Sequence, residues 1–338
     1  KNSCWKDSLK QAIRTPSALL SYLELEDHPY HISNKAQSIM PIMVPISFAS
    51  RIKKGDMNDP ILLQILPSIK EEESTDISFT LDPLMEQSQM PVKGVIHKYK
   101  GRVLLICSGA CAVHCRYCFR REFDYKEVLG SKESWDKSFD YIERDTSINE
   151  VILSGGDPLL LTDSHIKFFI DKIAKIKHIK RLRIHSRIPI VLPDRITDDL
   201  VDILSNHRLQ TVLVTHVNHA NELDDNVKSV LDKFKGRMTL LNQSTILKNI
   251  NDNAEVLSCL SERLFECGVL PYYLHTLDKV KGIKHFYITD LEAWKIHSKL
   301  QAILPGFLVP KMVKEVASKS NKILLSDFLF SPYVDEII

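Results

Sequence analysis

Residues 151–175 read VILSGGDPLLLTDSHIKFFIDKIAK and contain the clearest structural pattern in the chain. It begins with a short run of β-branched and aliphatic residues, Val151–Leu153, which predicts a buried strand. A glycine-containing turn follows, and apolar residues then recur at helical spacing from Ser164 to Lys175, which predicts an amphipathic helix. A strand followed by a helix is one βα unit, the building block of parallel sheets.

Five more runs of this kind occur along the chain, at Val103–Ile106, Leu182–His185, Thr211–Thr215, Met238–Leu241 and Val269–Leu274. After the first, longer interval they recur about every 30 residues, which is the length of a βα unit. Six strands that alternate with helices predict a parallel sheet, either doubly wound or closed as a complete or partial barrel. In both architectures the functional groups gather at the carboxyl ends of the strands.

Polar residues follow every one of the six predicted strands. They are Cys107–Gly109, Ser154–Asp157, His185–Arg187, Thr215–His219, Asn242–Ser244 and His275–Asp278. Loops are commonly polar, which would explain one or two of these groups and is a weaker explanation for all six. The pattern therefore predicts a single site at one mouth of the sheet.

The chain before the first predicted strand has a different pattern. Residues 1–95 contain two helix-like segments, Cys4–Ile13 and Pro16–Leu25, and then a turn-rich stretch. We therefore expect an N-terminal helical region with a linker at 1–95, a barrel core at 96–285 and a C-terminal segment at 286–338. Residues 1–95 hold no readable chemical motif.

Composition excludes several classes of protein. The chain has 338 residues with 45 basic and 43 acidic side chains, so no overall field attracts nucleic acid or an anionic membrane. No apolar stretch approaches the roughly 18 residues of a membrane span, and the first ten residues lack a signal-peptide core. The basic stretch Lys175–Arg187 could suggest nucleic acid, but it lacks aromatic residues for base stacking and alternates like a strand. We expect no nucleic acid and no membrane as partners.

Three of the seven cysteines fall within eight residues, at Cys111, Cys115 and Cys118. This spacing suits a metal site in a reducing compartment, here the cytoplasm, better than a disulfide framework. Soft thiolates select iron–sulfur clusters or zinc. Cys107 or His114 could complete a zinc tetrahedron, but neither has the usual paired spacing, whereas three thiolates on a four-iron cluster leave one iron open for a small molecule. Buried apolar thiols would have no reason to cluster on a loop, and the dispersed Cys4, Cys259 and Cys267 are interpreted as ordinary thiols.

The cysteine spacing, with Tyr117 before the last cysteine, resembles the signature of radical S-adenosylmethionine (SAM) enzymes. The resemblance implies an α/β fold, a partial (β/α)6 TIM-like barrel with an N-terminal helical segment and a short C-terminal extension. It also implies that Cys111, Cys115 and Cys118 hold a [4Fe-4S] cluster, and that the cluster reduces SAM to a radical. SAM contacts are implied at Tyr117, Ser154, Gly155, Gly156, Asp157, His216 and Gln243, with Asp157 suited to the methionine ammonium.

Further blocks are similar to lysine 2,3-aminomutases. They are Arg120–Arg121, Thr215–Glu222, Leu241–Ser244, Pro271–His275 and Gly282–Phe286. The blocks Cys111–Arg121, Ile179–Arg187 and Gly306–Lys311 resemble most closely the short branch of that family, which makes β-lysine for the modification of elongation factor P. The resemblance extends from Lys93 to Lys322.

This resemblance implies a second cofactor, pyridoxal 5'-phosphate, bound covalently to a lysine. The family pattern falls on Lys322 in the C-terminal segment, although Lys311, Lys314 and Lys319 are local alternatives. The register from Pro310 favours Lys322. A lysine that reacts with a carbonyl must lose its proton, and burial lowers a lysine pKa as required.

The resemblance assigns the remaining site residues as well. Tyr99 is expected against the pyridoxal ring and Arg102 at its phosphate, although an arginine at the start of a strand is more often a surface cation. Arg120 matches the arginine that binds the substrate carboxylate in two hydrogen bonds. Asp278 and Glu315 match two acids that hold the distal ammonium of lysine, with Glu315 standing where longer relatives have aspartate.

The implied activity is that of an isomerase that converts L-lysine into β-lysine by 2,3-amino migration. The implied partners are a reductant such as flavodoxin or ferredoxin and an enzyme that transfers β-lysine to elongation factor P. Two alternatives stay open: the same apparatus acting on another amino acid such as glutamate, and a non-catalytic iron–sulfur protein of the translation machinery. The acids Asp278 and Glu315 argue against an acidic substrate, and a non-catalytic protein would not cleave SAM.

Overall fold

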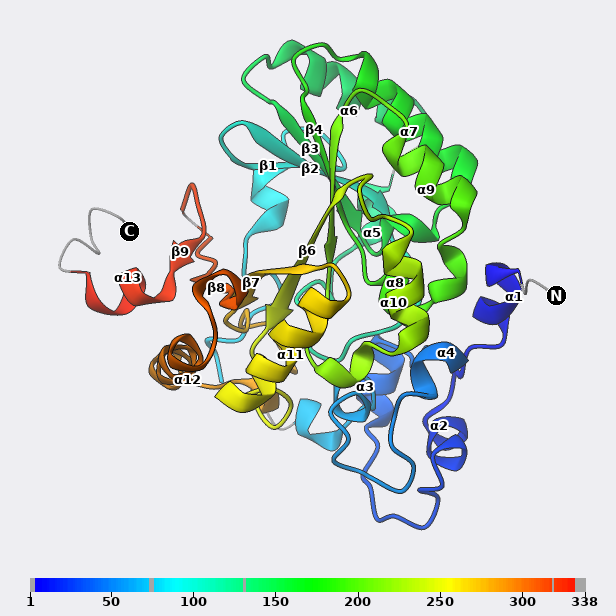
Figure 1. The fold of residues 1–338 in the computed structure, drawn as a ribbon, viewed down its shortest axis with the longest axis vertical. Helices are drawn as coiled ribbons and strands as arrows, with labels where there is room; N and C mark the ends of the chain where they lie inside the picture. The colour runs from blue at the N-terminus through cyan, green and yellow to red at the C-terminus, as the bar shows by residue number, and fades with distance from the viewer. Residues whose placement is uncertain (1–3, 73–75, 130–131, 318, 332–338) are drawn as a thin grey trace.

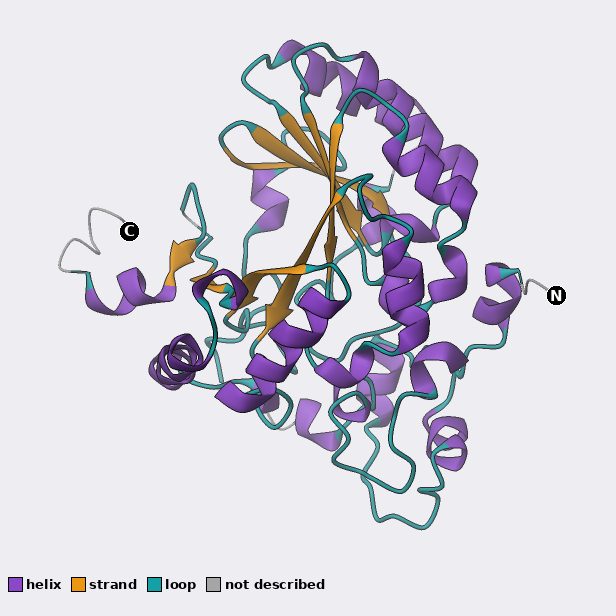
Figure 2. Ribbon diagram, viewed as in Figure 1, coloured by secondary structure: helices purple, strands orange, loops and turns teal. Residues whose placement is uncertain are grey.

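A single nine-stranded sheet organises the molecule (Figures 1 and 2). The computed structural model describes residues 4–72, 76–129, 132–317 and 319–331. The strands are β1 Val95–Tyr99, β2 Arg102–Ser108, β3 Glu150–Gly155, β4 Arg181–His185, β5 Gln210–Thr215, β6 Thr239–Thr245, β7 Leu270–His275, β8 Lys311–Lys314 and β9 Ile323–Leu324.

The strands lie side by side in the order of the sequence. Strands β2 to β8 are parallel, and β1 and β9 extend the two ends of the sheet as antiparallel neighbours of β2 and β8. A sequential parallel sheet curls like part of a TIM barrel, and here it stays open because β1 and β9 stand at its two ends. The predicted α/β partial barrel is therefore confirmed.

The six predicted strands correspond to β2 to β7, with ends that differ by a few residues. Three strands were not expected. Strand β8 was missed because its two buried apolar residues stand between two lysines, and β9 is only two residues long. Strand β1 joins β2 through a tight turn at Gly101, whose φ of 78° favours glycine. The domain limit expected at residue 285 falls between β7 and β8, which pair in the same sheet.

Helices connect the strands and pack on the sheet. They are α5 Tyr125–Val128, α6 Lys132–Arg144, α7 Asp163–Lys175, α8 Ile188–Val191, α9 Asp198–Ser205, α10 Asp225–Asp232, α11 Ala254–Glu266, α12 Asp290–Ile303 and α13 Leu325–Phe330. Helix α7 confirms the amphipathic pattern, because Ile166, Phe169, Ile170 and Ile173 are buried on one face. Thr162 caps its first turn. Among the described residues, no helix is both long and apolar enough to cross a membrane.

The N-terminal region contributes short helices, of which the one at Ile46–Ala49 (α4) lies beside α8 in Figure 1. They are α1 Trp5–Lys10, α2 Pro16–Tyr22, α3 Asn34–Ile39 and α4 Ile46–Ala49, followed by the 3-10 turns η1 Leu62–Gln64, η2 Ile69–Glu71 and η3 Glu86–Gln89. Further 3-10 turns are η4 Pro158–Leu160, η5 Pro193–Arg195, η6 Ala220–Glu222, η7 Lys284–Phe286 and η8 Gly306–Leu308. Leu19, Phe48 and Leu62 belong to the same buried cluster as the strands β2 to β5. The N-terminal region is thus packed onto the barrel.

Candidate active site

A cavity of about 640 Å3 occupies the interior of the open barrel and reaches the carboxyl ends of the strands. Every predicted site residue except Gly155 lines it. These residues are Tyr99, Arg102, Cys111, Cys115, Tyr117, Cys118, Arg120, Ser154, Gly156, Asp157, His216, Gln243, Asp278, Glu315 and Lys322. Residues that are more than 200 positions apart in the sequence therefore surround one space.

The cysteine loop follows β2 and presents Cys111, Cys115 and Cys118 to this cavity. Burial, reinforced by the neighbouring Cys115, raises the pKa of the Cys118 thiol to about 11, and burial also raises the pKa of Cys111. Among the described residues, no three side chains of His, Cys, Asp or Glu come close enough to share one metal ion. Three soft donors facing a common cavity suit a multi-iron cluster, in which each thiolate binds a different iron.

The loop after β3 lies directly against the cysteine loop. Gly155 has a φ of 129°, and a Cβ added there would stand 2.2 Å from the carbonyl oxygen of Ser108. A Cβ on Gly156 would stand 2.4 Å from the carbonyl oxygen of Ala110. Only glycine fits this approach, which explains the Gly-Gly pair by backbone packing.

Asp157 is already bound by donors of the protein. Its carboxylate accepts hydrogen bonds from the Ser186 hydroxyl and the Arg187 backbone N–H, both at 2.7 Å, and from the Leu159 N–H at 3.0 Å. Burial nevertheless raises the pKa of Asp157 to about 6. These bonds tie the end of β3 to the end of β4, a role that the motif did not indicate. The contact with a methionine ammonium stays a prediction.

Tyr117 and His216 form a stacked pair in the cavity wall. The Tyr117 hydroxyl lies 2.7 Å from Nε2 of His216, and the ring centroids are 5.6 Å apart. Burial, reinforced by the positive charge of Arg187, lowers the pKa of His216 to about 3, so the imidazole is neutral. A neutral imidazole and a phenol can orient a bound polar ligand without adding charge.

Arg120 is held by a partner that the sequence did not suggest. Its Nε and Nη2 lie 2.7 and 2.6 Å from the two carboxylate oxygens of Glu86, and Nη1 reaches the Ser154 hydroxyl at 3.4 Å. Glu86 lies in η3, in the region interpreted as a linker, and no motif surrounds it. Nη1 also donates to the Gly155 carbonyl at 3.4 Å, and the Arg120 side chain lines the cavity.

Lys322 reaches the cavity from the far end of the sheet. Its ammonium forms an ion pair with Glu315, which also accepts from the Tyr99 hydroxyl at 2.6 Å and from Lys98 Nζ at 3.1 Å. Burial opposes the charge of Glu315, but Lys322 and Lys98 together lower its pKa, so the carboxylate is ionised. The alternatives Lys311, Lys314 and Lys319 do not line the cavity, and Lys314 is paired with Asp290.

Asp278 behaves differently in the same space. Burial, reinforced by repulsion from Glu315, raises its pKa to about 7. The two acids therefore differ in their affinity for a proton, and a cation bound beside Asp278 would favour its ionised form.

The far end of the cavity is basic. The Arg102 guanidinium stacks on the Tyr99 ring at 4.4 Å from its centroid, and Lys98 lies beside it. Arg181 and Arg183 also line the cavity and pair with Glu150. These two residues of the basic stretch thus have the structural role favoured by their alternation.

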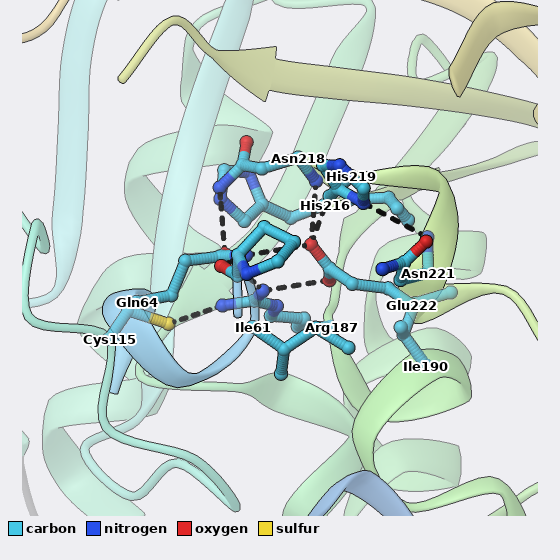
Figure 3. Close-up of polar contacts among 12 residues, drawn as sticks. Ile61, Gln64, Cys115, Arg187, Ile190, His216, Asn218, His219, Asn221 and Glu222 are labelled. Atoms are coloured by element: carbon cyan, nitrogen blue, oxygen red, sulfur yellow. Dashed lines mark hydrogen bonds and ion pairs between the residues drawn. The ribbon is translucent and has the colours of Figure 1, made fainter. Parts of the chain in front are cut away.

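Gln64, Glu86 and Lys98 were missed, because each is identified only by a partner far away in the sequence. His185, Arg187 and His275 stand in the polar groups predicted to follow the strands and line the cavity, but no role of its own was predicted for any of them. Arg187 and Glu222 stand inside blocks that resemble the family, but nothing in the sequence indicates that they meet (Figure 3).

Comparison with known proteins agrees with this arrangement. The model of the Radical SAM superfamily matches residues 105–254. An L-lysine 2,3-aminomutase of Haemophilus influenzae is 45% identical over 324 residues, which cover 96% of this chain and 96% of that protein. The L-lysine 2,3-aminomutase of Buchnera aphidicola is 46% identical over 324 residues, with 95% of each chain covered. That of Escherichia coli is 42% identical over 320 residues, covering 94% of this chain and 93% of the other.

The matched segment begins in β2 and contains the cysteine loop and the Gly-Gly-Asp loop, which lie against each other in the wall of the cavity. The likeness to the three aminomutases extends well beyond that segment on both sides, since it covers at least 94% of this chain. Because it covers nearly the whole length of this chain and of each relative, the chain belongs to the L-lysine 2,3-aminomutases, a family of isomerases within the radical SAM superfamily.

Proposed function

We propose that this chain converts L-lysine into β-lysine with a [4Fe-4S] cluster, SAM and pyridoxal phosphate. The single observation that carries the proposal is that the three thiols of the cysteine loop line the same cavity as Lys322 and the acids Asp278 and Glu315, whose pKa values differ. When bound, the cluster and SAM supply a radical, and pyridoxal phosphate supplies the carbonyl group that binds the migrating nitrogen. The residues of the chain bind, orient and shield the reactants.

Cys111, Cys115 and Cys118 would hold the cluster, since they are the soft donors that face the cavity. Ser154, Gly156 and Asp157, with Tyr117, His216 and Gln243, would hold SAM next to it. The backbone at Gly156 approaches the cysteine loop closely. A SAM molecule bound at Gly156 would therefore lie next to a cluster held by that loop.

Lys322 would hold pyridoxal phosphate. Its ammonium lies within the cavity, whereas the three neighbouring lysines lie outside. The stacked pair of Tyr99 and Arg102 offers a flat surface for the ring and a cation for the phosphate, and Lys98 adds a second cation nearby.

The substrate would be held at both ends by charge. Arg120 would bind the carboxylate, and Asp278 with Glu315 would bind the distal ammonium. A buried ammonium needs a counter-ion, and an acidic side chain such as that of glutamate would be repelled by the same two acids. Charge pairing therefore favours lysine over glutamate.

The test is an anaerobic assay of the reconstituted, reduced protein with L-lysine, L-ornithine, L-alanine and L-glutamate offered separately. We expect SAM cleavage and an isomerised product from L-lysine, with little or none from the others. A preference for L-glutamate or L-alanine would refute the substrate assignment. A cluster that never cleaves SAM with any of them would favour the non-catalytic iron–sulfur protein.

We also propose that the product serves the modification of elongation factor P. The similarity of the cysteine, Ile179–Arg187 and Gly306–Lys311 blocks to the short family branch supports this role. A flavodoxin or ferredoxin would supply electrons, and the cytoplasm would keep the seven free thiols reduced. The test combines the enzyme with elongation factor P and its lysyl-transferring enzyme. A mass increase on the factor that requires this chain is expected, and equal modification without it would overturn the role.

A further inference from the structure

Arg187 lies just after β4, and its guanidinium makes four contacts with surrounding polar groups; Figure 3 shows its surroundings, with the partners Cys115, Gln64 and Glu222 labelled. Nη1 lies 2.7 Å from Cys115 Sγ and 2.9 Å from the Tyr117 hydroxyl. Nη2 lies 2.7 Å from Gln64 Oε1 and 2.8 Å from Glu222 Oε2. The side chain is nearly enclosed, so its charge acts at short range with little screening by water.

Gln64 and Glu222 hold the guanidinium in this position. Gln64 lies in η1 of the N-terminal region, and its Nε2 donates to Glu222 Oε1 at 3.1 Å and to the Pro60 carbonyl at 2.9 Å. Glu222 is fully buried and also accepts from the backbone N–H groups of Asn218 and His219. With this many bonds, neither partner can turn away from Arg187 without leaving buried polar groups unpaired.

The charges of Glu222 and Arg187 are ordered relative to Cys115. The guanidinium stands between the Glu222 carboxylate and the Cys115 sulfur, so the positive end of the ion pair faces the sulfur (Figure 3). Its Nε has no hydrogen-bond partner within the described residues, so the guanidinium is not fully satisfied by the ion pair and its neighbours. Hydrogen bonds and positive charge at a ligating sulfur stabilise the reduced, more negative form of an iron–sulfur cluster.

We infer that Arg187 is a positioning residue that orients Cys115 and raises the reduction potential of the cluster held there, with Gln64 and Glu222 fixing its guanidinium. This inference rests on the proposed function, because it takes Cys115 as a cluster ligand. Arg187 acts through the sulfur and Tyr117, and it is distinct from the residues assigned to the substrate.

The experiment measures the midpoint potential of the reconstituted cluster by an anaerobic redox titration followed by electron paramagnetic resonance, without SAM. Arg187→Gln removes the charge, and we expect its potential to shift in the negative direction while iron and sulfide contents stay at the wild-type level. Arg187→Lys keeps the charge but not the fork of donors, so it should shift less. The matched control is Arg195→Gln. Arg195 is also buried and also forms an ion pair, with Asp163, but it binds the Leu159 and Leu161 carbonyls and none of the cysteines, so the potential of this variant should equal that of the wild type.

Glu222→Gln provides a second, independent variant of nearly unchanged shape. Removing the negative end of the ion pair leaves the guanidinium uncompensated, so the potential should shift in the positive direction, opposite to Arg187→Gln. Equal potentials for the wild type and Arg187→Gln, or shifts of the same sign in both variants, would overturn the inference. A wild-type protein that binds no cluster would instead refute the proposed function, which keeps the two failures apart.

Discussion

At the scale of single residues, the same cavity holds two carboxyl groups in different states. Glu315 is ionised because Lys322 and Lys98 offset the effect of its burial, whereas burial and the charge of Glu315 keep the pKa of Asp278 about 7. Glu315 is therefore ionised at neutral pH, whereas Asp278 is only partly ionised, and this difference in pKa leads to a prediction for the pH dependence of the enzyme.

The cofactor lysine is tested by trapping. Lys322→Ala should lose the pyridoxal phosphate that borohydride fixes to the wild-type chain, because no other candidate lysine faces the cavity. Lys311→Ala and Lys319→Ala should keep wild-type trapping, as read by mass spectrometry of the digested protein. Label found on Lys319 in the wild type would show that the register from Pro310 was misjudged.

The pKa of Asp278 predicts how kcat/KM for lysine depends on pH. Asp278 pairs with an ammonium only when ionised, so kcat/KM for lysine should rise with pH through about 7, the pKa of the free enzyme. Glu315 and Glu86 raise this pKa, and Lys322 and Lys98 lower it, with burial as the largest cause.

Asp278→Asn should remove that step and lower kcat/KM for lysine by roughly a hundred- to several-thousand-fold, the effect of about 3–5 kcal/mol for a broken buried pair. SAM cleavage should persist, because the radical-generating residues are separate. An unchanged pH profile in the variant would contradict the assignment.

The sequence predicted most of the cavity at this scale and missed its supporting contacts. Residues such as Cys111 and Lys322 could be predicted, because each falls on a position of a recognisable family motif. Glu86 and Gln64 carry no local signal, because their importance arises from side chains more than 30 positions away that the fold brings to them. Pairings of this kind follow from tertiary packing and not from spacing.

At the scale of elements, the loops after β2 and β3 form one unit because their backbones touch at Gly155 and Gly156. The strand pattern was predictable for β2 to β7, where runs of apolar residues are long. It failed at β1, β8 and β9, which lie at or next to the two ends of the sheet, and β8 and β9 are too short to show a periodic pattern.

Gly156→Ala tests the contact between the two loops. Its Cβ would meet the Ala110 backbone at 2.4 Å, and a backbone cannot yield as a flexible side chain does. We expect the free energy of unfolding to fall by about 3 kcal/mol in a denaturant titration, with loss of SAM binding. Gly306→Ala is the matched control, since nothing lies within 4 Å of its added Cβ, and it should leave stability nearly unchanged. Equal effects of the two substitutions would refute the close contact.

At the scale of the whole molecule, hydrogen bonds and ion pairs attach the N-terminal region to the cysteine loop. Arg116, between two of the cysteines, donates from Nε to Glu71 at 2.9 Å and from Nη1 and Nη2 to the carbonyls of Met40 and Ala36. The same Glu71 binds Arg121 at 2.7 Å. The region that showed no chemical motif thus fixes the loop that carries the cluster ligands.

Glu71→Ala tests how much these ion pairs contribute to stability. It would leave two buried guanidinium groups without their common counter-ion, so we expect the free energy of unfolding to fall by about 3–5 kcal/mol. Lys54→Ala breaks the exposed pair with Glu24 and should leave stability nearly unchanged, because water and salt screen an exposed ion pair. Chemical denaturation of both variants beside the wild type measures the difference, and a small effect of Glu71→Ala would show that the region is only loosely attached.

The central claim is that this molecule moves an amino group from carbon 2 to carbon 3 of lysine. The most direct measurement follows the nitrogen itself, with L-lysine labelled with 15N at its α-amino group and supplied to the reduced, reconstituted enzyme with SAM and pyridoxal phosphate under anaerobic conditions. We predict a product that carries the 15N on carbon 3, as located by nuclear magnetic resonance. Lysine recovered with all label on carbon 2, or a product whose carbon 3 nitrogen is unlabelled, would contradict the account.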